Sequence, residues 1–300
     1  MILAAIIAYI VPFELFLFAY AVLGPLHYLT EISWLHDRKY FSTGKFDYLW
    51  LALPAVPITA SFFVDLSEYQ NLNSHLMWIA FGGAIGMAFF AKGIQKVSIA
   101  ITFLLTGLLL TRYSFYAIFV ATLLPTIIHV YVFTGVFILY GALRSKNSVG
   151  YASFAVFILC AVIFFVIPAN VEGYILTEYV DKSIKPFMQI NKRFSELFGI
   201  DESWAGIVRV MQFMAYAYTY HYLNWFSKTQ VIRWHEISKS RMFAIILAWL
   251  ISLGVYSIDY RFGYIALFFL SLLHVLLEFP LNHKSIVGIG EELAIRLKVK

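Results

Sequence analysis

The chain has 300 residues, of which 61% are hydrophobic and only 13% are charged, and its mean hydropathy is +0.79. This composition excludes a water-soluble globular domain and predicts an all-α, polytopic integral membrane helical bundle, because each crossing of the bilayer needs about 20 apolar residues. The net charge of +5 is spread over short loops without a basic block or a nucleic-acid motif, so it indicates membrane topology rather than a nucleic-acid partner.

Apolar segments follow one another from the first residue to the last and predict about nine transmembrane helices in a single domain, residues 1–300. The third and fourth segments are short, so eight helices are an alternative. The first segment lacks the basic start and the cleavage site of a signal peptide and is therefore expected to be the first membrane helix. The segments are residues 2–23, 46–64, 75–91, 97–112, 115–142, 150–169, 204–226, 241–258 and 262–282.

Lysine and arginine alternate between successive loops, and cytoplasmic loops carry an excess of these residues. If the loops between the predicted segments are numbered in chain order, most lysines and arginines lie in the odd-numbered loops and at the C-terminus. The second loop has none, and the fourth and eighth loops have only Arg112 and Arg261, respectively. This pattern predicts an integral protein of a bacterial inner membrane with the N-terminus outside and the C-terminus in the cytoplasm. The long sixth loop, residues 170–203, is expected to be extracytoplasmic, and the stretch from Ile184 to Leu197 has the pattern of an amphipathic surface helix.

Ionisable side chains inside the apolar segments are a functional signal, because a charge at the bilayer centre costs on the order of 3 kcal/mol on insertion scales. Four histidines from four predicted helices are expected in the cytoplasmic half of the membrane, with His27 at the end of the first helix, and two of the four precede a glutamate by four residues. The single cysteine, Cys160, provides no cysteine-rich metal site, so histidine and carboxylate must supply any ligands. The polar residues are Glu14, His27 with Glu31, His129, Arg209 with Gln212, His221 with Asn224, and His274 with Glu278.

The two His-x-x-x-Glu pairs place histidine and glutamate on one helix face, about 6 Å apart between Cβ atoms. Such a pair can bind one metal ion together, or the glutamate can orient the imidazole that binds it. Histidine and carboxylate suit Fe, Mn or Zn, and with an open position they are typical of non-haem Fe(II) oxygen chemistry. We therefore predict a site for Fe(II), in preference to zinc or manganese, with the ligands His27, His129, His221 and His274. Glu31 and Glu278 are expected to be ligands, orienting groups or catalytic residues.

Each histidine taken alone is more commonly a hydrogen-bonded packing residue or an interfacial side chain than a ligand. His36 or His235, both in basic loops, could replace one of the four predicted ligands. His75 lies at the start of the third segment, on the predicted outer side, and is the alternative to His129.

Two further groups of residues have structural explanations. Glu14 and Arg209 lie at comparable depth in the predicted outer half, and an ion pair between them would satisfy both charges.

The 20 Tyr, 29 Phe and 7 Trp residues exceed what interfacial belts need. Aromatic rings commonly fill helix interfaces, but they can also line a cavity for a long conjugated or isoprenoid substrate. The candidate substrate-binding residues are Tyr28, Tyr218, Tyr222 and Trp225.

These motifs resemble those of a known family. The stretch Gly24-Pro25-Leu26-His27 with Glu31 is similar to the Gly-Leu-Pro-His motif, with an acidic residue four positions later, of the Brp/Blh family of membrane β-carotene 15,15′-dioxygenases. Leu273-His274 with Glu278 resembles the late histidine and acid of that family, and His221 resembles its penultimate histidine segment. The resemblance implies a helical membrane enzyme that binds iron through histidines and cleaves a carotenoid with O₂, releasing retinal. It matches His27, His221 and His274, and leaves His129 or His75 as the remaining ligand.

Two functions from different classes account for these residues. One is a membrane-embedded oxygenase that acts with O₂ on a lipophilic, carotenoid or isoprenoid-like substrate while the helices exclude water. The other is a transporter or proton-coupled channel that uses the same histidines and glutamates as a relay; a scaffold in which they only bond helices together is a third interpretation. The sequence shows no internal repeat, and its polar residues cluster on one predicted side, which favours the enzyme. Membrane lipids are expected partners, and the sequence does not indicate an oligomeric state.

Overall fold

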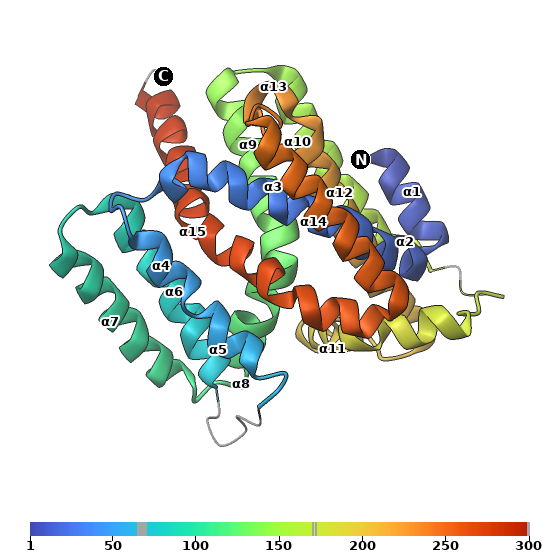
Figure 1. The fold of residues 1–300 in the computed structure, drawn as a ribbon. Coiled ribbons are helices and arrows are strands. Elements are labelled where there is room, and N and C mark those ends of the chain that lie inside the picture. The colour runs from blue at the N-terminus through green and yellow to red at the C-terminus, as the bar shows by residue number, and fades with distance from the viewer. Residues whose placement is uncertain (65–70, 170, 172, 299–300) are drawn as a thin grey trace. The chain divides into compact units, whose positions relative to one another are not determined.

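The computed structural model describes residues 1–64, 71–169, 171 and 173–298, and all regular secondary structure in these ranges is helical (Figure 1). The helical fold class predicted from composition is thus confirmed for the described chain. The elements are α1 (Ile2–Ile10), α2 (Pro12–Phe18), η1 (Ala19–Leu23), α3 (Gly24–Asp37), η2 (Lys39–Phe41), α4 (Asp47–Ala52), α5 (Ala55–Ala60), α6 (Leu72–Phe89), α7 (Gly93–Leu110), α8 (Ser114–Ala117), η3 (Ile118–Phe133), α9 (Thr134–Ser145), α10 (Ser148–Val166), α11 (Glu178–Phe198), α12 (Trp204–Ser227), α13 (Thr229–Ile232), α14 (Lys239–Ile258) and α15 (Tyr260–Lys298).

Seven helical stretches of the described chain are long and apolar enough to cross a membrane. This finding indicates an integral membrane protein, whereas the predicted number of nine, or eight, spanning helices is not confirmed. The stretches are Pro12–Asp37, Leu72–Phe89, Gly93–Leu110, Ser114–Ser145, Ser148–Val166, Lys239–Ile258 and Tyr260–Lys298.

Prolines divide two of the predicted segments. Val11 has non-helical dihedral angles, φ −133° and ψ 64°, because a following proline disfavours the helical conformation. The predicted first segment therefore splits into α1 and a longer helix that begins at Pro12 and continues to Asp37. The predicted segment 46–64 is divided at Pro54 into α4 and α5, which have 6 residues each.

Pro280, in contrast, does not end its helix, and the helix continues well beyond residue 282, where the ninth predicted segment ends. α15 runs through this proline to Lys298, a length of 39 residues. Helices in membranes tolerate an interior proline because neighbouring groups satisfy the freed backbone carbonyl.

The residues form two compact units, each made from two separate stretches of the chain. The first unit is Met1–His27 with Thr126–Tyr264, and the second is Tyr28–Pro125 with Ile265–Lys300. In the second unit α6 and α7 form a helical hairpin whose two arms lie side by side, and α4 and α5 lie against α6 (Figure 1).

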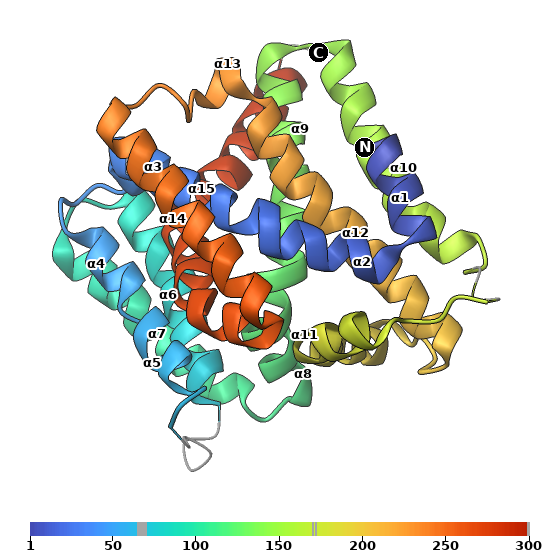
Figure 2. The same cartoon turned by 45° about the vertical axis from the view of Figure 1, so that its right-hand side comes forward.

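α12 is the central helix of the first unit, where it lies against α1, α2, α10 and α11 (Figure 2). It confirms a helix at the predicted position 204–226, yet it is not among the seven apolar stretches. Its sequence mixes tyrosine, glutamine and histidine with apolar residues, and most of these side chains are buried. A helix covered by other helices does not face lipid and can carry these polar groups where they find partners.

The predicted sixth loop contains α11, which begins at Glu178 rather than at Ile184. Thr177 caps its start by accepting a hydrogen bond from the Val180 N–H at 3.3 Å. Ile184 and Phe187 are buried, while the charged residues of the helix face outward, so the predicted amphipathic pattern is present. Asn170 and Glu172 of this loop lie outside the described residues, as do residues 65–70 of the predicted second loop.

Candidate metal centre

Three of the four predicted ligands come from separate helices of the first unit. His27 lies in α3, directly after the π-type turn η1, His129 lies in the π-type helix η3, and His221 lies in α12. All three side chains are buried, with exposed fractions of 1%, 1% and 7%. π-type turns widen a helix and are frequent at functional sites, and no pattern in the sequence indicated them here.

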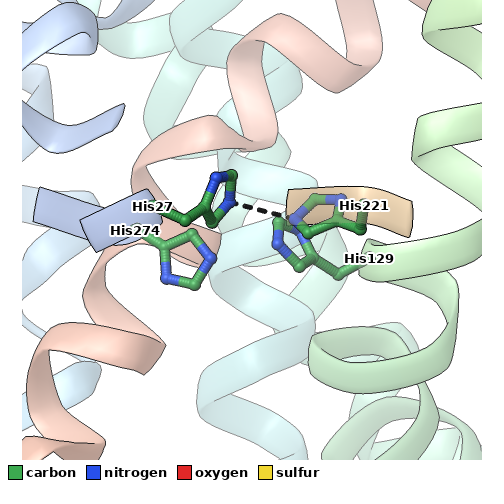
Figure 3. Close-up of side chains that lie close together, drawn as sticks. All are labelled: His27, His129, His221 and His274. Atoms are coloured by element: carbon green, nitrogen blue, oxygen red, sulfur yellow. Dashed lines mark hydrogen bonds between the residues drawn. The ribbon is translucent and has the colours of Figure 1, made fainter. Parts of the chain in front are cut away.

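The imidazole rings of these three histidines lie against one another (Figure 3). The Nε2 atoms of His27 and His221 are 3.0 Å apart, and the ring centroids of His129 and His221 are separated by 4.9 Å. Two nitrogens that bind one metal ion at about 2.1 Å in neighbouring positions lie roughly 3 Å apart. The spacing of His27 and His221 is therefore one that a shared metal ion would produce.

The fourth predicted ligand, His274 of α15, is buried as well. Each of the four histidines offers one ligand nitrogen, and these atoms all lie within 4.8 Å of one another (Figure 3). Two ligands on opposite sides of one ion are about 4.2 Å apart, so the group is close in size to a single coordination sphere. This four-histidine group could hold a metal ion, and because imidazole suits Zn, Cu, Fe and Ni alike, its geometry does not select the metal.

Thr134, at the start of α9, determines which nitrogen of His221 can bind. Its hydroxyl donates to the Val130 carbonyl at 2.9 Å, so its oxygen is left to accept the hydrogen bond of 2.8 Å from His221 Nδ1. A proton on Nδ1 would make His221 Nε2, which lies 3.0 Å from His27 Nε2, the nitrogen that accepts a hydrogen bond or binds a metal ion. A second hydrogen bond of this kind commonly fixes the tautomer of a metal-binding histidine.

The two predicted glutamates meet in the second unit. Glu31 of α3 and Glu278 of α15 are both buried, and their carboxyl groups lie close enough to interact electrostatically. Asn282 Nδ2 donates a hydrogen bond of 3.4 Å to Glu278 Oε2. Their predicted roles as ligands or catalytic groups stay predictions.

The four predicted substrate-binding residues lie at different places. The rings of Tyr222 and Trp225 lie beside the His27 imidazole, with centroids 5.0 and 5.4 Å away. Tyr28 stacks on His274 at 5.8 Å. Tyr218 packs against Tyr222 at 6.2 Å, one ring further from the histidines. Their part in substrate binding stays a prediction.

The alternative ligands do not join the four-histidine group. His75 Nδ1 forms a hydrogen bond of 3.1 Å with the Tyr116 hydroxyl, so His129 rather than His75 is the member of the group. His36 is bonded to the Tyr40 hydroxyl at 3.2 Å. His235 lies edge-on to its neighbour Trp234, in the turn before α14.

Glu14 has a different partner from the predicted Arg209. Its carboxylate accepts a hydrogen bond of 2.6 Å from the Tyr174 hydroxyl, which lies in the loop before α11. Burial, and then the hydrogen bond to Glu14, raise the pKa of Tyr174 above its usual value, so the phenol stays protonated at neutral pH. Because a tyrosine so far along the chain gives no periodic signal, the sequence did not indicate this pair.

Comparisons of the chain with protein-family profiles, with curated proteins and with solved structures found no match.

Proposed function

We propose that the chain is a membrane-embedded, non-haem iron oxygenase that acts with O₂ on a lipophilic substrate, a carotenoid or a similar isoprenoid. The observation that supports this proposal is the convergence of four buried histidines in a chain of apolar helices. Buried ionisable groups in membrane segments are costly and are usually kept for a function. Iron is favoured because histidine sites with open positions are typical of non-haem iron enzymes.

In this proposal the four histidines hold the ion through neutral imidazole nitrogens, and the bound ion supplies the activation of O₂. The Thr134 hydroxyl, hydrogen-bonded to His221 Nδ1, would keep the other ring nitrogen available to hold the ion. Tyr222 and Trp225 offer ring faces beside His27 on which a flat conjugated chain can stack. The helices exclude water, so the protein mainly binds, orients and shields the reacting groups.

The relay interpretation has less support. A path for protons or ions needs polar groups distributed across the depth of the membrane. The ligand atoms of the four histidines instead converge within 4.8 Å, which is the arrangement that binding one ion requires.

Metal analysis of the purified full-length protein tests the metal site. We expect about one equivalent of iron in the wild type, and its loss in His27→Ala and His274→Ala. His75→Ala is the matched control, because it removes a histidine from a membrane helix without touching the four-histidine group. A folded wild-type protein that takes up no Fe(II) would exclude the proposal.

The substrate class needs a separate assay. With β-carotene in detergent micelles and O₂, the iron-loaded wild type is expected to bleach the carotenoid absorption and consume O₂, and His221→Ala is expected to do neither. An iron-loaded protein that leaves carotenoids and other isoprenoids unchanged would disprove the substrate and leave the metal site intact.

A further inference from the structure

Tyr28 has a buried hydroxyl group with no hydrogen-bond partner among the described residues. The side chain is 4% exposed and follows His27 directly in α3. Its ring stacks on the His274 imidazole, with the centroids 5.8 Å apart and the planes inclined by 30°. An unsatisfied polar group therefore lies against one of the four candidate ligands.

Other buried tyrosines of this chain have the partner that Tyr28 lacks. The Tyr216 hydroxyl donates to the Phe157 carbonyl at 3.1 Å, and the Tyr260 hydroxyl donates to the Leu17 carbonyl at 3.0 Å. This is the usual state, because buried hydroxyl groups are nearly always hydrogen-bonded and the membrane interior offers no water to replace a partner. A phenylalanine at position 28 would provide the same ring without the unsatisfied oxygen, so packing alone does not explain the hydroxyl.

We infer that the Tyr28 hydroxyl donates a hydrogen bond to the exogenous ligand of the metal centre, a small molecule or anion with a free lone pair. The inference rests on the proposed function, since it needs a metal ion in the four-histidine group. The imidazoles cannot supply this bond, because an imidazole that binds a metal through one nitrogen carries its N–H on the far side of the ring. Tyr28 is thus a binding residue that stabilises negative charge on the exogenous ligand.

Azide binding to the Co(II)-loaded full-length protein tests this role. The visible absorption of Co(II) reports the histidine ligands, and azide is the small anionic probe. In Tyr28→Phe we expect the stoichiometry and spectrum of bound Co(II) to be unchanged, and the dissociation constant of azide to rise by about tenfold or more, as for a lost hydrogen bond to a charged group. Tyr216→Phe is the control, because it removes a buried hydroxyl whose partner is a backbone carbonyl; its azide affinity is expected to stay within about twofold of the wild type.

The outcomes separate the inference from the proposed function. Equal azide affinity in the wild type and Tyr28→Phe would overturn the inference and leave the metal site standing. Loss of Co(II) from Tyr28→Phe would also overturn it, because the hydroxyl would then serve to hold His274. Failure of the wild type to bind Co(II) would overturn the proposed function itself. If Tyr28→Phe does not fold, the wild type itself provides the test. The infrared stretching band of bound azide should shift between H₂O and D₂O, because a hydrogen bond from the Tyr28 hydroxyl exchanges its proton for deuterium. The absence of a shift would overturn the inference.

Discussion

The hydrogen bond between Thr134 and His221 is the contact that orients the candidate metal centre. The Thr134 hydroxyl proton is committed to the Val130 carbonyl, so the His221 Nδ1–H is the only proton left for the contact of 2.8 Å. Without that acceptor, His221 could place its proton on Nε2, the atom 3.0 Å from His27 Nε2, and could not bind a cation there. A neutral hydroxyl that is not itself a candidate ligand can thus control which nitrogen of His221 binds the metal ion.

Thr134→Val is expected to lower the affinity of the protein for its metal by about 10 to 100 fold, the usual effect of removing a group that orients a ligand. Valine has nearly the same shape, so the α9 backbone should stay in place. Thr134→Ser keeps the hydroxyl and is expected to retain the wild-type affinity. The measurement is competition for Fe(II) or Co(II) with a chelator, and equal affinities in the valine and serine variants would contradict the role of the hydroxyl.

The histidines could be predicted from the sequence, and Thr134 could not, for a physical reason. A histidine or glutamate in an apolar segment is conspicuous because its burial is expensive, so His27 and Glu31 stand out with no knowledge of the fold. A threonine is inexpensive in a membrane helix because it can bond its own helix backbone, and 87 positions separate Thr134 from His221. Only the packing of the first unit brings those two residues together.

The hairpin of α6 and α7 depends on a glycine at which the two helices approach closely. A Cβ atom at Gly82 would overlap the Phe103 ring of α7, whereas a Cβ atom at the adjacent Gly83 would have no atom within 4 Å. Small residues let membrane helices approach, and packing is their main source of association.

Gly82→Ala is therefore expected to destabilise the protein by about 1 to 3 kcal/mol, the usual cost of overfilling a packed interface. Gly83→Ala should be neutral or slightly stabilising, since alanine is the better helix former by about 1 kcal/mol. Thermal unfolding of both variants in the same detergent measures the difference. If the two substitutions lower the midpoint equally, the close approach at Gly82 does not contribute to stability.

The helices themselves were predictable to different degrees. Continuous apolar runs such as Ser148–Val166 need only length and hydropathy, so their positions follow from the sequence. The positions at which helices are interrupted were harder to predict, because proline has opposite effects in this chain. Pro54 separates two helices, whereas Pro280 lies inside one. Which outcome occurs depends on whether neighbours satisfy the freed carbonyl, and that is a property of packing rather than of the local sequence.

The distribution of basic residues is a property of the whole chain and predicts its orientation in the membrane. Arg296 and Lys298 lie in the last turn of α15, and Lys284 lies within the same helix, whereas Arg261 is the only lysine or arginine of this helix before Lys284. Since lysine and arginine close to a spanning helix hold that end in the cytoplasm, this asymmetry predicts that the C-terminal end of α15 lies on the cytoplasmic side. The predicted cytoplasmic position of His274 and Glu278 depends on it.

Reporter fusions test this orientation. A fluorescent protein fused to the C-terminus is expected to fluoresce and alkaline phosphatase at the same position to be inactive, because the enzyme folds only outside the cytoplasm. Phosphatase fused after Gly199, in the loop between α11 and α12, is the control expected to be active. Replacing Lys284, Arg296 and Lys298 together with glutamine removes the basic residues of this helix end and should increase phosphatase activity at the C-terminus. Active phosphatase on the unaltered C-terminus would reverse the topology and move the proposed metal centre to the outer half of the membrane.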